Sequence, residues 1–195
     1  MRRLGFKRFI LGIGYNANFI KKYYDKHKIP GVDIVFSKEN RPLGTGGAVK
    51  KAEALIKSSH FLVLNGDSYA KFDKSKFIKF YERKRANVLI LLKKAANKKE
   101  FGEVIIDKDA KIICFKEKGL RVHDNFINAG VYLFNKKVFS MMPKGARFSL
   151  EYDFFPSMVG KGIYGYKQEG FFIDIGTPER YSAAKRYLAG LNKRG

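Results

Sequence analysis

The chain has 195 residues, of which 45% are hydrophobic, so its length and composition suit one globular domain with a substantial core and argue against disorder. Its single cysteine, Cys114, excludes an intramolecular disulfide and a zinc site built from cysteines, and is consistent with a cytoplasmic protein. No apolar run reaches the roughly 18 to 20 residues that span a bilayer. We therefore expect no membrane partner.

The net charge of +22 favours an anionic partner or substrate. The basic residues are mostly lysines, scattered along the chain in doublets such as Lys21–Lys22 and Lys136–Lys137. A nucleic-acid-binding face more often concentrates arginines and aromatic residues in one stripe. We interpret the charge as a solvated surface that also suits phosphorylated small substrates, and expect no dedicated nucleic-acid site.

In the first half of the chain, short apolar runs alternate with amphipathic stretches of helix length, which is typical of an α/β domain with parallel strands. We expect strands at 8–14, 32–36, 60–67 and 87–94, with the nearly all-apolar third strand in a central position. Helices are expected at 16–28, from the glycine loop to about residue 57, and after Asp73, which is the expected N-cap of the third helix. In the first helix Asn16 is the expected N-cap, with Phe19, Ile20 and Tyr23 on the buried side.

In the second half the pattern changes to that of a mixed sheet. Two short strands around a turn at 107–110 predict a hairpin, and an apolar strand follows at 126–134. Asn135 and Ser149 are expected to cap two short helices, and two more strands precede a final helix that starts at Thr177 and Pro178. Because no linker separates the halves, we expect a single domain, 1–195.

The glycine-rich stretch RPLGTGGAVKKA, residues 41–52, precedes a run with helical spacing. Glycines at 44, 46 and 47 would let backbone N–H groups approach a ligand at a helix N-terminus. The spacing matches neither the dinucleotide fingerprint G-x-G-x-x-G nor the P-loop, which ends in G-K-[ST]. From the residues alone, an ordinary strand-to-helix turn and a ligand loop both remain open.

Two aspartates, Asp67 and Asp174, each follow an apolar strand. In open α/β sheets ligands bind outside the carboxyl ends of the strands, and a pair of carboxylates there suits Mg²⁺. Each aspartate is also a good turn residue, so the metal site and the turn remain alternatives.

Further polar candidates lie near other strands. Glu117 and Lys118 at a strand end are either a surface ion pair or ligands of sugar hydroxyls and phosphate. Asn128, within an apolar strand, either serves the fold or faces a polar ligand. The three histidines show no ligand spacing and receive no role.

Five segments, in order, resemble the sugar-1-phosphate nucleotidyltransferases: RPLGTGGAVKKA, FLVLNGDSY, FKEKG, NAGVYLF and FFIDIGTPERY. Within that family, the segment FSLEYDFFP favours the branch of heptose 1-phosphate guanylyltransferases, while uridylyltransferases and mannose-1-phosphate guanylyltransferases stay open. The resemblance implies a Rossmann-like α/β fold of the nucleotide-diphospho-sugar transferases, with a mixed, mostly parallel sheet. It also implies GTP and a sugar 1-phosphate as substrates and Mg²⁺ as cofactor.

The site residues that the resemblance implies fall into three groups. Asp67 and Asp174 would bind Mg²⁺ and, with Lys118, form the catalytic set. The nucleotide base would lie against Leu43, Gly44, Thr45 and Gly46. The sugar would contact Gly102, Glu117, Asn128 and Glu151, although Gly119 stands where the family usually has proline, which puts the position of that loop in question.

The family's leading signature, a strand and a loop resembling G-G-x-G-T-R-L, has no counterpart in this sequence. We therefore hypothesise that the domain is truncated at its N-terminus. Two consequences stay open: this chain is inactive alone, or an upstream piece, joined to it or supplied in trans, completes it. In the family's strand order, the missing strand would lie between 8–14 and 60–67. Two other functions remain open, a non-catalytic homologue that binds nucleotide sugars and a polyanion-binding protein. The base, the sugar and homo-oligomer formation stay undecided.

Overall fold

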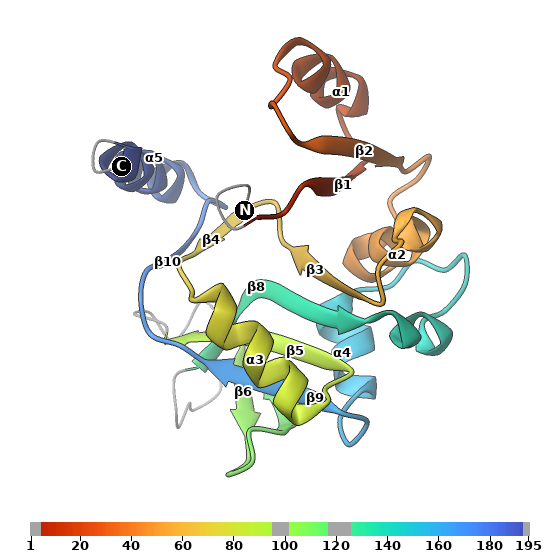
Figure 1. Cartoon of the computed structure of the whole chain (residues 1–195), viewed down its shortest axis with the longest axis vertical. Coiled ribbons are helices and arrows are strands. Elements are labelled where there is room, and N and C mark those ends of the chain that lie inside the picture. Colours follow the sequence, from red (N-terminus) through yellow and green to blue (C-terminus); the bar gives the residue numbers. More distant parts are fainter. Residues whose placement is uncertain (1–4, 95–101, 117–125, 193–195) are drawn as a thin grey trace. The chain divides into compact units, whose positions relative to one another are not determined.

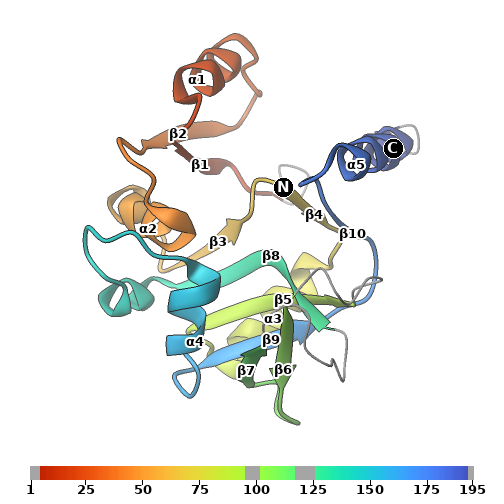
Figure 2. The ribbon, with the colours of Figure 1, turned by 180° about the vertical axis from the view of Figure 1, so that it is seen from behind.

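The computed structural model describes residues 5–94, 102–116 and 126–192 of the chain. Contacts within the chain divide it into two compact units, which Figures 1 and 2 show from opposite sides. The first unit combines Met1–Phe61 with Lys136–Met158, and the second combines Leu62–Asn135 with Val159–Gly195. Each unit thus joins two segments that are distant in the sequence.

The first unit contains a parallel pair of strands and several helical segments. Strand β1 (Arg8–Ile13) pairs with β2 (Asp33–Lys38), with Arg8 opposite Asp33, and helix α1 (Ala17–Lys26) connects them. The remaining elements are α2 (Gly44–Lys51), the 3-10 helices η2 (Ala52–Leu55) and η3 (Lys136–Met141), the π-helical η4 (Leu150–Phe154) and α4 (Phe155–Ser157).

Helix α1 forms where the sequence predicts it, but its expected cap is wrong. Of its expected buried side only Ile20 is half-buried. Asn16 takes a left-handed conformation, with φ of 54°, and its side chain makes no capping hydrogen bond. Phe19 is 72% exposed and Tyr23 is 51% exposed, and Ala17 is the buried residue of the helix. A sheet of two strands offers α1 a narrow surface, which leaves little room to bury large aromatic side chains.

The second unit is built on a six-stranded sheet in the order β7-β6-β8-β5-β9, with β3 paired to β8 off this path. A separate antiparallel pair joins β4 to β10. The helices are α3 (Lys74–Lys84) and α5 (Pro178–Asn192). The strands are β3 (His60–Leu64), β4 (Ser68–Ala70), β5 (Val88–Lys94), β6 (Glu103–Ile106), β7 (Ile112–Lys116), β8 (Phe126–Asn135), β9 (Ile163–Lys167) and β10 (Phe172–Asp174).

The strand pairing is mixed, as predicted, but fewer of the described pairs are parallel than the sequence suggests. The pairs β1–β2 and β5–β9 are parallel, whereas β5–β8, β6–β7, β6–β8 and β4–β10 are antiparallel. Strand β3 is also not the central strand, since its residues are half-buried or exposed. The buried centre is β5, whose residues from Val88 to Lys93 are all buried. Among the described strands, β1 pairs with β2 alone and β3 with β8 alone.

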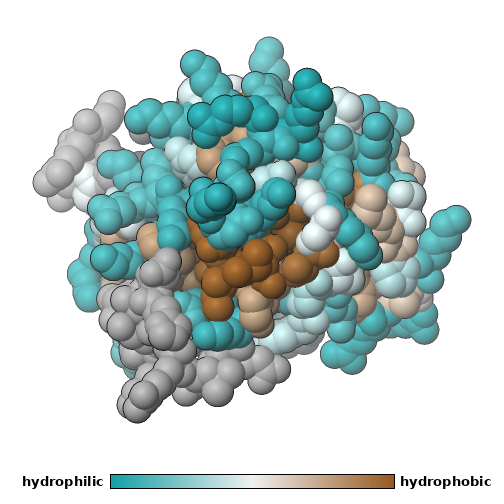
Figure 3. All heavy atoms as spheres, turned by 90° about the horizontal axis from the view of Figure 1, so that it is seen from below, coloured by the Kyte–Doolittle hydropathy of each residue, from teal (hydrophilic) through white to brown (hydrophobic). Residues whose placement is uncertain are grey.

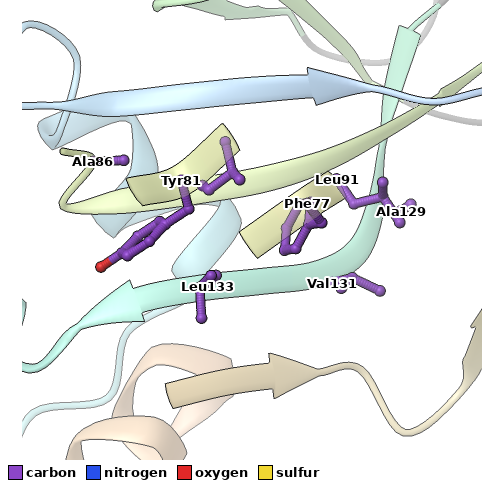
Figure 4. Packing of buried hydrophobic residues seen from close by; sticks show 8 residues of the cluster. Phe77, Tyr81, Ala86, Leu91, Ala129, Val131 and Leu133 are labelled. Atoms are coloured by element: carbon purple, nitrogen blue, oxygen red, sulfur yellow. The ribbon is translucent and has the colours of Figure 1, made fainter. Parts of the chain in front are cut away.

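The core of the second unit lies between α3 and the sheet (Figure 4). Phe77 and Tyr81 on α3 pack against Leu91 of β5 and against Val131 and Leu133 of β8. The carboxylate of Asp73 accepts a hydrogen bond from the backbone N–H of Lys76, at 3.0 Å, so the predicted N-cap of α3 is confirmed. This cap and the apolar face of α3 fix the helix on the sheet.

The surface view in Figure 3 shows a mostly hydrophilic face with one hydrophobic patch, as expected for a lysine-rich chain. Among the described helices, none combines the length and the apolarity that crossing a membrane requires.

Candidate active site

The glycine loop packs against the segment that leads into η4, and we call residues 43–47 and 148–151 together the glycine cluster. The backbone N–H groups of Gly46 and Gly47 donate to the carbonyl oxygen of Phe148, at 3.0 and 3.3 Å. The N–H group of Phe148 donates in turn to the carbonyl of Leu43, at 3.0 Å. These amides therefore bind the protein's own backbone instead of pointing freely at a phosphate.

Two glycines of this cluster are required by their surroundings. Gly44 has a φ of +72°, and a Cβ there would lie 2.5 Å from the carbonyl oxygen of Phe148. A Cβ on Gly46 would lie 2.2 Å from an atom of the buried Phe148 ring. Since real Cβ atoms do not approach other atoms this closely, the close packing of Phe148 explains both glycines.

The glycine cluster also joins two residues that the sequence singled out separately, Thr45 and Glu151. The Thr45 hydroxyl donates to Oε2 of Glu151 at 2.7 Å and accepts from the backbone N–H of Leu150 at 2.8 Å. The predicted cap at Ser149 is confirmed, since its hydroxyl accepts from the N–H groups of Glu151 and Tyr152. The half-buried Glu151 carboxylate is thus held at the start of η4.

A second group of site residues gathers where β4 pairs with β10, and we call Asp67, Ser68, Asp174 and Arg180 the aspartate cluster. Asp67 lies in the turn just before β4, and Asp174 is the last residue of β10, opposite Ser68. The N–H group of Ile175 donates to the carbonyl of Asp67 at 2.8 Å. The antiparallel pairing therefore brings the two predicted aspartates to neighbouring positions.

The two aspartates have different surroundings. Both carboxylate oxygens of Asp174 accept from Nη1 of Arg180, each at 2.8 Å, and one also accepts from the N–H of Gly176. Asp67 is exposed, and the hydroxyl of Ser68 donates to its Oδ1 at 3.2 Å. Sequence reasoning missed Arg180, although its place in the first turn of α5, shortly after Asp174, was a usable signal.

The oxygen donors of the aspartate cluster fit Mg²⁺, the cofactor that the family resemblance implies. Mg²⁺ prefers oxygen ligands and often takes one or two carboxylates, completing its shell with phosphate oxygens and water. Asp67 supplies an exposed carboxylate for this purpose, and Asp174 supplies one fixed by Arg180. In the described residues no three His, Cys, Asp or Glu side chains form a complete metal cage, so phosphate oxygens would have to supply further ligands.

Lys93 anchors the segments that flank β4 and β10. This fully buried lysine on β5 donates to the carbonyl of Lys71 at 2.6 Å and to that of Glu169 at 2.8 Å. Burial lowers the pKa of its ammonium group. Lys71 follows β4 and Glu169 precedes β10, so Lys93 stabilises this strand pair from the end opposite the aspartates.

Asn128 stabilises an irregular part of β8. Its side-chain oxygen accepts from the N–H of Gly130, and its amide nitrogen donates to the hydroxyl of Tyr132, each at 2.9 Å. The register of β8 against β5 shifts at this point, and Gly130 has a φ of +68°. The carbonyl of Gly130 accepts from the N–H of Asn65, so the segments NAG and NGD of the sequence meet here.

The remaining predicted sugar contacts are only partly described. A Cβ on Gly102 would lie 2.7 Å from the carbonyl oxygen of Lys116, so this glycine permits a close approach between β6 and β7. Glu117 and Lys118 lie outside the described residues.

Comparison with known proteins identifies relatives of this chain. Residues 3–190 match the model of the family described as nucleotidyl transferase. The D-glycero-alpha-D-manno-heptose 1-phosphate guanylyltransferase of Aneurinibacillus thermoaerophilus is 34% identical, over 96% of this chain and 81% of the relative. The mannose-1-phosphate guanylyltransferase of Mycobacterium tuberculosis is 30% identical over 91% of this chain, which spans about half, 50%, of that longer protein.

Solved structures agree with these relatives. The crystal structure of HddC from Yersinia pseudotuberculosis has a TM-score of 0.85 and 34% identity, covering 96% of this chain and 81% of HddC. A second structure of HddC, with a TM-score of 0.84, is a complex with GMP-PN. The resemblance and the α/β fold inferred from the sequence are confirmed: the chain belongs to the nucleotidyl transferase family.

Proposed function

We propose that this protein transfers a guanylyl group from GTP to a sugar 1-phosphate, with a heptose 1-phosphate as the preferred acceptor, and releases pyrophosphate in nucleotide-sugar synthesis. The names of the relatives support guanylyl transfer and a heptose acceptor. The observation that carries the proposal is the aspartate cluster, in which strand pairing brings Asp67 and Asp174 to neighbouring positions. Two carboxylates at neighbouring positions of one strand pair suit chemistry on a polyphosphate.

The reaction needs no general base from the protein. An oxygen of the anomeric phosphate attacks the α-phosphorus of GTP, and the bond to the oxygen that bridges the α- and β-phosphates breaks. The second pKa of a phosphate monoester is about 6, so the attacking oxygen is ionised at neutral pH. Catalysis then depends on positioning and on neutralising negative charge.

The cluster residues would divide this work. Asp67 and Asp174 would hold Mg²⁺, which, when bound, supplies positive charge to the phosphate oxygens. Arg180 keeps the Asp174 carboxylate in one orientation. Lys118 would add a cation for the transferring phosphate.

The substrate contacts in the proposal follow the family resemblance. Leu43, Gly44, Thr45 and Gly46 would line the base, and Gly102, Glu117, Asn128 and Glu151 would line the sugar. In the described structure Glu151 bonds to Thr45, and Asn128 bonds to Gly130 and Tyr132, so each side chain is already fixed in place. Preorganised polar groups of this kind bind a sugar hydroxyl without further ordering.

Assays with each combination of two nucleotide donors and two sugar 1-phosphate acceptors test the proposal. Pyrophosphate release is measured with GTP or UTP as donor and with D-glycero-α-D-manno-heptose 1-phosphate or mannose 1-phosphate as acceptor, each with Mg²⁺. We expect release with GTP and the heptose 1-phosphate to exceed every other combination by at least about tenfold, a difference of roughly 1.4 kcal/mol in barrier. Equal rates with UTP would contradict the guanylyl assignment. Tight binding of the nucleotide sugar without turnover would instead support a non-catalytic homologue.

A further inference from the structure

A cavity of about 570 Å³ lies within the first unit, beside α2. One wall is formed by the loop before α2 and by the helix itself, and the other by residues 144–146. In Figure 2 the loop that leads into α4 passes beside α2. We call this space the basic cavity, because its lining includes Arg41, Lys50, Lys51 and Lys144 and, within the described residues, no carboxylate.

Among the described residues, three of the four cations have no carboxylate partner. Lys50 is 2.7 Å from the carboxylate of Glu53 and donates to the carbonyl of Phe139, so its charge is balanced and its position is fixed. In the part of the chain that the structure describes, Arg41, Lys51 and Lys144 form no ion pair. Like charges that surround one cavity repel each other, and a bound anion relieves that repulsion.

The walls of the basic cavity are held together before any ligand arrives. Nη2 of Arg41 donates to the carbonyl of Gly145 at 3.2 Å, which links the two walls. The hydrogen bonds between Phe148 and the glycine loop join the same two segments. A Cβ on Gly47 would lie 3.0 Å from the carbonyl of Ala146, so the walls are in close contact at this point. The cavity is therefore a formed part of the fold.

The basic cavity lies on a different face of α2 from the contacts of the glycine cluster. Leu43, Gly47, Lys50 and Lys51 line it, and their spacing of three and four residues places them on one side of the helix. Thr45 is two residues from Leu43, about 200° around the helix, and it bonds to Glu151 instead. Apart from Leu43, the cavity thus uses residues that the proposed transfer reaction does not employ.

We propose that the basic cavity is a binding site for a compact oligophosphate, an anion with two or more linked phosphate groups. Its volume lies in the range of small-molecule sites, about 300–1,000 Å³. A guanidinium group beside flexible ammonium groups is a combination that recognises phosphate oxygens, with arginine able to bind two at once. A cavity of this volume, with the apolar Leu43 in its lining, favours a small ligand over a nucleic-acid strand, which would need a longer basic groove. The inference does not depend on the proposed transferase activity.

To test the site, the full chain is titrated with inorganic tripolyphosphate at fixed ionic strength in the presence of EDTA. Isothermal titration calorimetry measures the binding. EDTA removes divalent cations. A parallel titration of the Asp67→Asn variant shows whether any of the measured binding depends on the aspartate cluster. The test variant is Lys51→Gln with Lys144→Gln. The matched control is Lys21→Gln with Lys22→Gln, which removes the same charge from exposed positions on α1 outside the cavity. Melting curves of all variants report their folding.

We expect saturable binding near one equivalent that is weakened at least about tenfold in the cavity variant, since charge-assisted hydrogen bonds are lost. The control variant and Asp67→Asn should bind within about twofold of the wild type. Equal weakening in the cavity and control variants would overturn the proposal, because binding would then follow net charge alone. The absence of saturation, or tighter binding of a DNA duplex that the cavity substitutions do not affect, would also overturn it. If the wild-type chain binds tripolyphosphate as expected but shows no transferase activity, that result would count against the proposed function alone.

Discussion

The glycine cluster and the aspartate cluster both consist of residues that the sequence marks as functional, but different interactions hold them. In the glycine cluster the backbone dominates: amides of Gly46 and Gly47 bind the carbonyl of Phe148, and two glycines avoid its atoms. In the aspartate cluster charged side chains dominate, with Asp174 held by Arg180 and Asp67 exposed to solvent.

The glycine cluster is therefore explained by close packing, whereas the aspartate cluster presents charged groups that can take part in chemistry. A glycine-rich loop attracts attention as a ligand site, yet its composition here is explained by close contact with Phe148. We therefore expect substitutions in the glycine cluster to act first on stability, and substitutions in the aspartate cluster to act first on activity.

The largest stability effect is expected for Gly44→Ala. The new Cβ would meet the backbone carbonyl of Phe148 at a position with positive φ, so strain and overpacking add to about 2–4 kcal/mol. Urea denaturation measures the loss. Gly31→Ala is the matched control, because Gly31 has the same φ of +72° and open space around it. A similar loss in both variants would show that φ alone, not Phe148, requires the glycine.

The corresponding test of the aspartate cluster is Arg180→Gln. Removing the guanidinium leaves the partly buried Asp174 carboxylate without its ion-pair partner, which should cost about 1–3 kcal/mol and lower the transfer rate. The control is Arg186→Gln at an exposed position of the same helix, where stability should change by less than about 0.5 kcal/mol. Equal effects of the two substitutions would refute the positioning role of Arg180.

A smaller effect is expected for Thr45→Val in the glycine cluster. Valine keeps the shape of threonine but removes the hydrogen bonds to Glu151 and to the N–H of Leu150, at a cost of about 1–2 kcal/mol. Thermal and urea unfolding should agree on this loss. If Thr45→Val and Glu151→Gln destabilise the protein additively in a double-mutant cycle, the two side chains are not coupled as the structure indicates.

The smallest effect concerns pH and the start of α5, which carries Arg180. Hydrogen bonds from its own backbone N–H and from the Thr177 side chain lower the pKa of Glu179 below its ordinary value of 4.5. Such a carboxylate stabilises the fold above pH 4.5, and this contribution is lost as pH falls through the lowered pKa. The stability difference between the wild type and Glu179→Gln should therefore shrink between pH 6 and the acid limit. A constant difference would contradict this reading.

Local signals in the sequence were sufficient for much of the fold. The caps at Asp73 and Ser149 and the hairpin turn at Asp107 were predicted because each depends on side chains that bond to backbone nearby. The exposure of Phe19 was not predictable, since amphipathic spacing does not say how much sheet a helix finds to cover.

The same limit applies to the candidate site. Asp67 and Asp174 are predictable as metal ligands because each follows an apolar strand. Their closeness in space depends on the pairing of β4 with β10, which are far apart in the sequence. Phe148 gave no signal of its own, because its contact with Gly46 arises only when distant segments fold together. The residues that hold site residues in place were thus harder to predict than the site residues themselves.

The most direct test measures activity and stability together in Asp67→Asn. Because this exposed carboxylate bonds to Ser68 and supports little packing, we predict unfolding free energy within about 0.5 kcal/mol of the wild type. With GTP, the heptose 1-phosphate and Mg²⁺, pyrophosphate release should fall at least about a hundredfold, as expected when charge stabilisation of a transition state is removed. A wild-type rate, or a lost rate that merely follows unfolding, would contradict the assignment of transfer chemistry to the aspartate cluster.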